Sequence, residues 1–327
     1  MGVGKLLLVG ENWIYYIMYD PSKPYKKQIL ELIRDTWHTP YVSIKPGIYP
    51  LIEKKFSYPE VDHTDGIGTK GVYHWKRRTF KNAVRDALAM NLNDLLLVRA
   101  TPYALQNHIV LPEDDHEAIL EIIAALSEEC KKRNIAITGG ETSIHKGSSF
   151  DISITVSGFV KNPKPNKFQI DDVLIGLSSA GLHSNGFTKV REVFKDEFRE
   201  EFVSPTPIYF DTILSLFGKY DVHGMMHITG GAFTKLKDLL DGTDVRVTRD
   251  HKLEPQAIFH ELYARGIPDR EMYRTFNCGI GFIFSIPAEE ASRVLSEIDG
   301  AVIGEVTQGS GAVIVESAFS NKIIHFQ

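Results

Sequence analysis

The sequence has very little cysteine and lacks any long apolar run. Cys130 and Cys278 are the only cysteines in 327 residues, which argues against a disulfide framework or a cysteine zinc site and fits a reducing compartment. A membrane-spanning helix needs roughly 20 apolar residues. The apolar run at Leu6–Gly10 is much shorter and has no small-residue cleavage site after it. We therefore expect a soluble, cytoplasmic protein with no membrane partner.

The sequence also lacks a strong excess of one charge, repeats and low-complexity tracts. Its formal net charge of -5 gives no sign of the basic surface that nucleic-acid binding requires. Local cationic patches that suit a small anionic substrate remain compatible with this average. Hydrophobic residues make up 43% and charged residues 24% of the chain, a balance that buries a sizeable core. The length suggests one large domain or two of ordinary size.

Two series of helices and strands are predicted, separated by a segment rich in proline, asparagine and lysine at residues 161–172. Apolar periodicity predicts helices in the first series, and apolar-polar alternation predicts strands. The first series has helices at 24–37, 83–98 and 112–134 and strands at 136–138 and 151–160; the second has strands at 172–179, 278–286, 301–306 and 311–316 and helices at 185–194 and 229–240. We therefore predict an α/β protein of the α+β type, with domains at residues 1–165 and 166–327.

The stretch "VDHTDGIGTK" places an acid, two glycines and a lysine within six residues. Gly66 and Gly68 allow unusual backbone angles and let N–H groups approach a ligand closely. Lys70 could meet a phosphate, and Asp65 could bind Mg²⁺, which prefers oxygen ligands and substrate phosphates. The spacing is not that of a Walker A loop, and a plain Asp-Gly turn with a solvated lysine is the alternative.

Two further acids follow apolar elements. In "NLND", Asp94 lies at the end of a predicted helix, where its charge opposes the helix dipole by up to roughly 1 kcal/mol unless a cation compensates. In "TGGETS", Glu141 comes directly after a strand and the predicted turn Gly139–Gly140. Asp65, Asp94 and Glu141 could converge on a metal-nucleotide, or they could belong to three unrelated turns.

The second series contains two loops that precede predicted helices. In "SSAGLHSNGF", Ser184 or Asn185 can cap a helix whose N-terminus favours an anion, and His183 could donate to a phosphate or move a proton. In "HITGGAF", the glycines before the helix offer another backbone cradle for a phosphate. An ordinary capped helix with a surface histidine is the alternative for the first loop.

Taken in order, the motifs resemble aminoimidazole ribonucleotide synthetase, also called phosphoribosylformylglycinamidine cyclo-ligase. The resemblance runs from about Val61 to the end of the chain and is carried by "HTDGIGTK", "NDLLLVRATP", "GGETS", "DVLIGLSSAGLHSNGF", "VHGMMHITGGAF" and "EMYRTFNCGIGF". It implies a two-domain PurM-like fold and a homodimer in which the N-terminal sheets join across the two-fold axis. It also implies ATP and Mg²⁺ as cofactors and ATP-dependent closure of formylglycinamidine ribonucleotide to the imidazole of aminoimidazole ribonucleotide, a step of purine biosynthesis.

The resemblance also implies roles for residues of this chain. It implies catalytic roles for Asp65, Lys70, Asp94 and His183, and a metal site at Asp65, Asp94 and Glu141. It places the nucleotide at Gly66, Gly68, Thr69, Lys70, Asn93, Gly139, Gly140, Glu141 and Thr142. It places the ribonucleotide at His183, Ser184, Asn185, Gly186, Thr229, Gly230 and Gly231.

The sequence departs from the family pattern in several segments. "RATP" stands where the family tends to have Gly-Ala-Glu-Pro, "SIHKG" follows "GGET", and the early segment "YVSIKPGIYPLI" has one glycine. These differences motivate two alternatives. One is a paralogue of the superfamily that acts as an ATP-dependent kinase or ligase on another substrate, and the other is a non-catalytic nucleotide-binding subunit.

Overall fold

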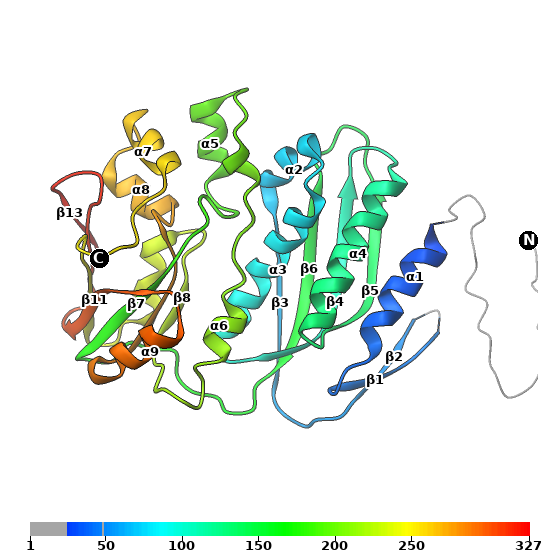
Figure 1. The fold of residues 1–327 in the computed structure, drawn as a ribbon, viewed down its shortest axis with the longest axis horizontal. Helices are drawn as coiled ribbons and strands as arrows, with labels where there is room; N and C mark the ends of the chain where they lie inside the picture. Colours follow the sequence, from blue (N-terminus) through cyan, green and yellow to red (C-terminus); the bar gives the residue numbers. More distant parts are fainter. Residues whose placement is uncertain (1–24, 48) are drawn as a thin grey trace, which may run out of the picture.

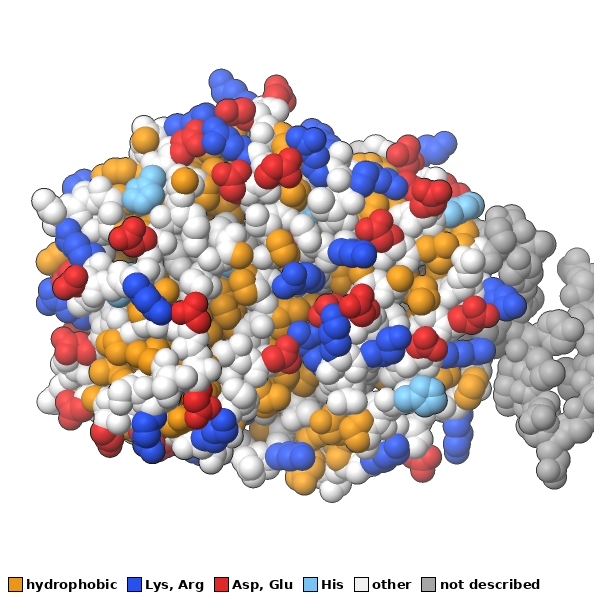
Figure 2. Space-filling model, in the orientation of Figure 1, with side chains coloured by type: hydrophobic (Ala, Val, Ile, Leu, Met, Phe, Trp, Pro, Cys, Tyr) orange, Lys and Arg blue, Asp and Glu red, His pale blue; other side chains and the backbone are white. Residues whose placement is uncertain are grey.

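The computed structural model describes residues 25–47 and 49–327. The N-terminal apolar run falls outside these residues. Two sheets lie side by side, with helices covering their faces (Figure 1). In the described part of the chain, no helix has both the length and the apolar character needed to cross a membrane. Acidic and basic side chains mix over the face in Figure 2.

The first sheet has four strands in the order β3-β6-β4-β5. The outer pair β3–β6 and the central pair β6–β4 are antiparallel, whereas β4 and β5 run parallel. The strands are β3 (Glu60–Gly66), β4 (Thr101–Leu111), β5 (Ala136–Ile144) and β6 (Asp151–Phe159). In β6 the expected alternation holds, because Ile152, Ile154 and Val156 are buried while the intervening side chains are partly exposed.

Helices α3 (Phe80–Leu97) and α4 (His116–Lys132) pack against this sheet and against each other (Figure 1). Helix α4 begins at His116, four residues after the predicted start at Pro112, and the Asp115 carboxylate caps it by accepting a hydrogen bond from the Ala118 N–H at 2.9 Å. Helix α1 (Lys26–Arg34) packs on α4 and continues into the short 3-10 helix η1 (Asp35–Trp37). A small hairpin of β1 (Val42–Lys45) and β2 (Leu51–Lys54) follows.

The second sheet has seven strands in the order β13-β12-β9-β11-β7-β10-β8. Its strands are β7 (Asp172–Ser178), β8 (Met225–His227), β9 (Thr243–Val247), β10 (Ile280–Pro287), β11 (Ala301–Gln308), β12 (Val313–Glu316) and β13 (Ile323–Phe326). The α-helices of this half are α5 (Phe187–Phe194), α6 (Phe210–Leu214), α7 (Ala257–Ala264), α8 (Asp269–Thr275) and α9 (Ala291–Glu297). Short 3-10 helices are η3 (Glu200–Val203), η4 (Ala232–Leu239) and η5 (Ala288–Glu290).

Local structure differs from two of the predicted elements. Gly139 and Gly140 do not form a turn, because β5 continues through them and pairs with β4 as far as Ile144. The predicted helix at 229–240 is the 3-10 helix η4 rather than an α-helix. The glycine segment leads from β3 through the 3-10 helix η2 (Gly68–Lys70) into helix α2 (Gly71–Arg77).

One polar face of α3 holds a segment of the second half, residues 203–210. Asn82 donates to the Val203 carbonyl at 2.9 Å, and Asp86 accepts from the Thr206 N–H at 2.7 Å. Asn93 Oδ1 accepts from the Tyr209 N–H at 2.8 Å. Residues 82, 86 and 93 are four and seven positions apart, so they lie on one face of the helix. The helix that carries Asp94 is therefore fixed to the second half.

Candidate active site

A cavity of 510 Å³ lies where the two halves meet. Residues of both halves line it, and several of them come from the motifs that the sequence singles out. The lining residues are Asp65, Gly66, Ile67, Gly68, Met90, Asp94, Asp151 and Ser153 from the first half and Ser184, Asn185, Thr229, Gly230 and Lys235 from the second. Eight of these thirteen are predicted site residues: Asp65, Gly66, Gly68, Asp94, Ser184, Asn185, Thr229 and Gly230.

The glycine segment brings main chain rather than side chains to the cavity. Asp65 is near the end of β3, and its Oδ1 accepts a hydrogen bond from the Gly66 N–H at 2.7 Å. A Cβ atom on Gly66 would lie 2.7 Å from the Ser153 hydroxyl oxygen and 3.1 Å from the Ile152 carbonyl oxygen. Gly68 has a φ of +55°, which favours glycine. The close approach of β6 and this left-handed turn explain the two glycines.

Asp94 is a carboxylate that two histidines face. Its Oδ1 lies 3.0 Å from Nδ1 of His227, and its Oδ2 lies 3.6 Å from Nε2 of His63. Burial favours the neutral acid, but the hydrogen bond from His227 and the positive charge of Lys235 outweigh burial and lower the pKa of Asp94. Asp94 is therefore held in its ionised form.

The Asn93 amide fixes the orientation of His227. Asn93 Oδ1 accepts from main-chain N–H groups, so its Nδ2 faces Nε2 of His227 at 3.3 Å and donates to it. The His227 proton is then on Nδ1 and points to Asp94. Burial lowers the pKa of His227 despite the nearby carboxylate, so this imidazole is neutral at pH 7. Asn93 thus acts through His227 and does not line the cavity.

Asp151 is a lining residue that the sequence analysis does not single out. It begins β6, and its Oδ1 is buried without a hydrogen-bond partner among the described residues. Burial raises the pKa of Asp151, and the neighbouring main-chain N–H groups and the Ser153 hydroxyl only partly oppose this. The sequence feature that could have identified Asp151 is an acid at the start of an alternating strand.

Lys235 is a second lining residue that was not predicted, and its Nζ lies 3.4 Å from the Thr229 hydroxyl.

Lys70 does not reach the cavity, so the prediction that it contacts a phosphate is wrong for this structure. Its amine is buried and donates to Asp86 at 2.9 Å and to the Ser204 carbonyl at 2.6 Å. Nε2 of His74 lies 2.8 Å from the second Asp86 oxygen. The positive charge of Lys70 and the hydrogen bond from His74 lower the pKa of Asp86 despite its burial. Lys70 joins the glycine segment to the second half.

The predicted trio of metal-binding acids does not come together within one chain. Asp65 is on β3 and Glu141 on β5, with β6 and β4 between them. Adjacent strands are spaced by about 4.8 Å, so this separation exceeds the reach of one ion. Glu141 is exposed, and in the described part of the chain no three His, Cys, Asp or Glu residues are grouped to hold a metal. Gly139, Gly140 and Thr142 share this distant strand.

The remaining predicted residues lie near the cavity without lining it. His183 is buried, not on the surface, and its Nε2 accepts from the Ala180 N–H at 3.2 Å. Burial holds the pKa of His183 well below its usual value, which does not suit donation to a phosphate. Thr69 is exposed on η2, while Gly186 and Gly231 have left-handed φ angles directly before α5 and η4.

Two family models match most of the chain. The AIR synthase related protein N-terminal domain matches residues 57–160, and the corresponding C-terminal domain matches residues 169–316. A phosphoribosylformylglycinamidine cyclo-ligase from Saccharolobus solfataricus is 32% identical over 92% of this chain and 94% of its own. The protein of that name from Pyrococcus horikoshii is 34% identical over 71% of this chain and 73% of its own.

Solved structures share the fold at much lower sequence identity. Escherichia coli HypE, a hydrogenase maturation protein, superimposes with a TM-score of 0.65 at 14% identity, covering 92% of this chain and 96% of its own. Thiamine-monophosphate kinase from Stenotrophomonas maltophilia gives a TM-score of 0.63 at 18% identity, covering 89% and 96%. The predicted two-domain fold is thereby confirmed.

Proposed function

Because the chain belongs to the AIR synthase related protein family, we propose that it is an ATP-dependent cyclo-ligase that converts formylglycinamidine ribonucleotide to aminoimidazole ribonucleotide. The observation that carries this proposal is the 32% identity to a cyclo-ligase over 92% of the chain. The cavity between the two halves supports it, because candidate residues of both halves line it.

The reaction needs an activated amide oxygen. An amide oxygen is a poor leaving group, and transfer of the γ-phosphoryl group of ATP makes it a good one. Phosphoryl transfer depends on positioning and on neutralising charge. A cavity with main-chain groups from a glycine segment on one side and polar side chains on the other suits this requirement. We place the nucleotide at Asp65, Gly66 and Gly68.

Asp65 and Asp94 are our candidate ligands for Mg²⁺. This ion usually binds to one or two carboxylates together with phosphate oxygens and water, so it needs no cluster of three protein ligands. Both acids line the cavity, and His227 and its neighbours keep Asp94 ionised. When bound, Mg²⁺ would supply neutralising charge for the phosphates.

The ribonucleotide is proposed to bind on the side of the second half. Ser184, Asn185, Thr229 and Gly230 face the cavity there, and Lys235 is its cationic side chain. Hydroxyl, amide and ammonium groups are donors to a phosphate. We further propose a homodimer, domains at residues 1–165 and 166–327, and a place in the cytoplasm.

Activity with defined substrates tests the proposal. With Mg²⁺ and formylglycinamidine ribonucleotide, the purified protein is expected to form ADP and an aminoimidazole in equal amounts. It is expected to form no ADP with thiamine monophosphate, the substrate class of the kinase alternative. A folded protein that binds ATP but yields no aminoimidazole would contradict the proposal.

A further inference from the structure

His63 is a histidine of β3 whose ring proton has a fixed position. The Asn91 side-chain amide donates through Nδ2 to the Ala87 carbonyl at 2.9 Å and to the Asp65 main-chain carbonyl at 3.2 Å. Asn91 Oδ1 is therefore the acceptor that lies 2.9 Å from Nδ1 of His63. Nδ1 carries the proton of the neutral ring, so Nε2 presents its lone pair.

This lone pair faces a second acceptor. Nε2 of His63 lies 3.6 Å from Oδ2 of Asp94, whose Oδ1 already accepts from Nδ1 of His227 at 3.0 Å. A hydrogen bond between an imidazolium and a carboxylate would be about 2.7–2.9 Å long, so the contact is too long for a shared proton. The His63 side chain is 31% exposed and that of Asp94 17%. A cation from solvent can therefore reach both atoms.

Asp65 is on the same side of β3 as His63. The two residues are two positions apart on the strand, so their side chains point to one face. Their partners on β6 are Ile154 for Asp65 and Val156 for His63, and both partners are buried in the core that α3 covers. Helix α3 carries Asp94. One imidazole nitrogen and two carboxylates are thus directed to the side of the strand where β3 meets α3.

We propose that His63 and Asp94 together bind a divalent transition-metal ion, with Co²⁺ and Mn²⁺ preferred to Mg²⁺. An imidazole nitrogen suits first-row transition ions, whereas Mg²⁺ prefers oxygen ligands. Ligand atoms lie about 2.1 Å from such an ion, so two of them can share it when they are up to about 4.2 Å apart. The separation of 3.6 Å between Nε2 and Oδ2 meets this condition.

The inference names the ion for the metal site of the proposed function, and it rests on the placement of that site at Asp65 and Asp94. It does not depend on which substrate reacts. Phosphate oxygens and water would supply the ligands that the protein does not. His63 would then determine which ion accompanies the nucleotide, because a nitrogen ligand raises the affinity for transition ions and leaves that for Mg²⁺ unaffected.

Metal binding to the full-length protein, first freed of metal with a chelator, tests this inference without turnover. In pulsed electron paramagnetic resonance, the Mn²⁺-loaded wild type should show coupling to an imidazole nitrogen nucleus. His63→Ala should lose this coupling. It should also bind Mn²⁺ and Co²⁺ at least about 10-fold more weakly, since even indirect partners of a metal contribute that much. Calorimetry with Mg²⁺ should give the same affinity for both proteins.

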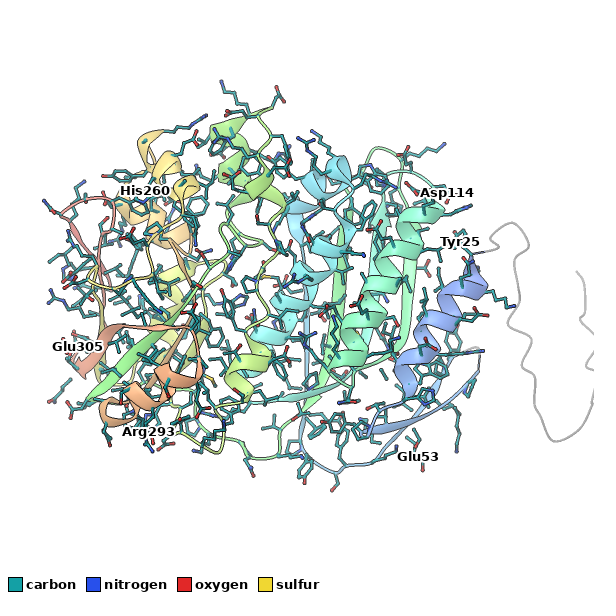
Figure 3. The ribbon with its side chains drawn as sticks, viewed as in Figure 1. Tyr25, Glu53, Asp114, His260, Arg293 and Glu305 are labelled. Carbon is teal, nitrogen blue, oxygen red and sulfur yellow. The ribbon has the colours of Figure 1, made fainter. Side chains whose placement is uncertain are left out.

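Two controls accompany this experiment. His260→Ala removes an exposed histidine on α7, labelled in Figure 3 on the outer side of the second half, and should keep the nitrogen coupling and all affinities. Thermal unfolding shows whether His63→Ala is folded. The wild-type spectrum tests the inference independently of any variant.

Other results would overturn the inference. A Mn²⁺-loaded wild type without nitrogen coupling would show that His63 is not a ligand. Equal losses of Mn²⁺ and Mg²⁺ affinity in His63→Ala would assign His63 a structural role in placing Asp94. A protein that shows the coupling but forms no aminoimidazole would instead overturn the proposed reaction and support the metal site.

Discussion

Nδ1 of His227, on strand β8 of the second half, lies 3.0 Å from Oδ1 of Asp94, on helix α3 of the first half. The imidazole is buried and neutral, and Asn93 sets the position of its proton. A contact between the halves therefore sets the charge and orientation of a cavity carboxylate. Residues that hydrogen-bond a metal ligand typically change metal affinity or activity by about 10- to 100-fold when they are removed.

Removal of the histidine should weaken the metal-nucleotide complex. His227→Gln loses the donor to Asp94, so we expect a higher pKa for Asp94 and about 10-fold weaker Mg²⁺-dependent ATP binding. Calorimetry with ATP at several Mg²⁺ concentrations measures this change. His325→Gln, at an exposed position on β13, should bind as the wild type does. Equal affinity in the two variants would show that His227 does not act on the site.

The buried Lys70–Asp86 pair should dominate the stability of the junction. Lys70→Met leaves the Asp86 carboxylate buried without its ammonium partner, and breaking such a pair costs about 3–5 kcal/mol. Urea denaturation at pH 7 measures the free energy of unfolding. Lys132→Met removes a lysine that forms half-exposed ion pairs, which solvent screens, so this variant should unfold at nearly the same urea concentration as the wild type. Similar losses in both variants would contradict the prediction.

Stability should fall as the pH decreases from about 7 to 5. Burial lowers the pKa of His74, His183 and His227 in the folded protein, whereas the unfolded chain titrates near 6.5. The unfolded chain thus binds more protons, so stability is fully present above about pH 6.5 and declines below it. Urea denaturation at pH 7.5 and 5.5 checks the sign, and His183→Leu should reduce the difference. A stability that rises toward pH 5.5 would refute this assignment.

A methyl group on Gly71 should disrupt the start of α2. A Cβ there would lie 1.9 Å from the Phe150 carbonyl oxygen, which is main chain and cannot rotate away. We expect Gly71→Ala to lose more than about 2 kcal/mol of stability and to reduce activity, because Phe150 directly precedes Asp151. Gly242→Ala, with a φ of +68° and open space around the new methyl, should cost about 1 kcal/mol. Thermal unfolding of both variants distinguishes a clash from backbone strain.

The sequence predicted the elements whose periodicity is regular. Helix α4 has acids before it and lysines at its end, and β6 alternates cleanly, so both lie close to their predicted positions. Strand β4 was not predicted, because irregular register near Pro102 and after Leu105 breaks its alternation. The Gly139–Gly140 pair predicts a turn, whereas in the structure both residues lie in β5 and pair with β4.

Part of the candidate site could be predicted because local sequence motifs carry it. Motif glycines and acids such as Asp65 and Asp94 line the cavity, and their spacing reflects the local main-chain conformation. The burial of Lys70 depends on Asp86 and on Ser204, which is 134 residues away in sequence. Asp151 lines the cavity because β6 pairs with β3, which brings it beside the glycine segment, and no local pattern encodes that long-range placement.

The polar face of α3 limits how this protein can be recombined with its relatives. A fragment that ends before residue 203 would leave Asp86 without Thr206 and Asn93 without Tyr209. Chimaeras that take each half from a different parent should therefore assemble well only when residues 203–210 come from the same parent as α3. Helix α3 and residues 203–210 should therefore be exchanged between relatives together, although they are far apart in the sequence.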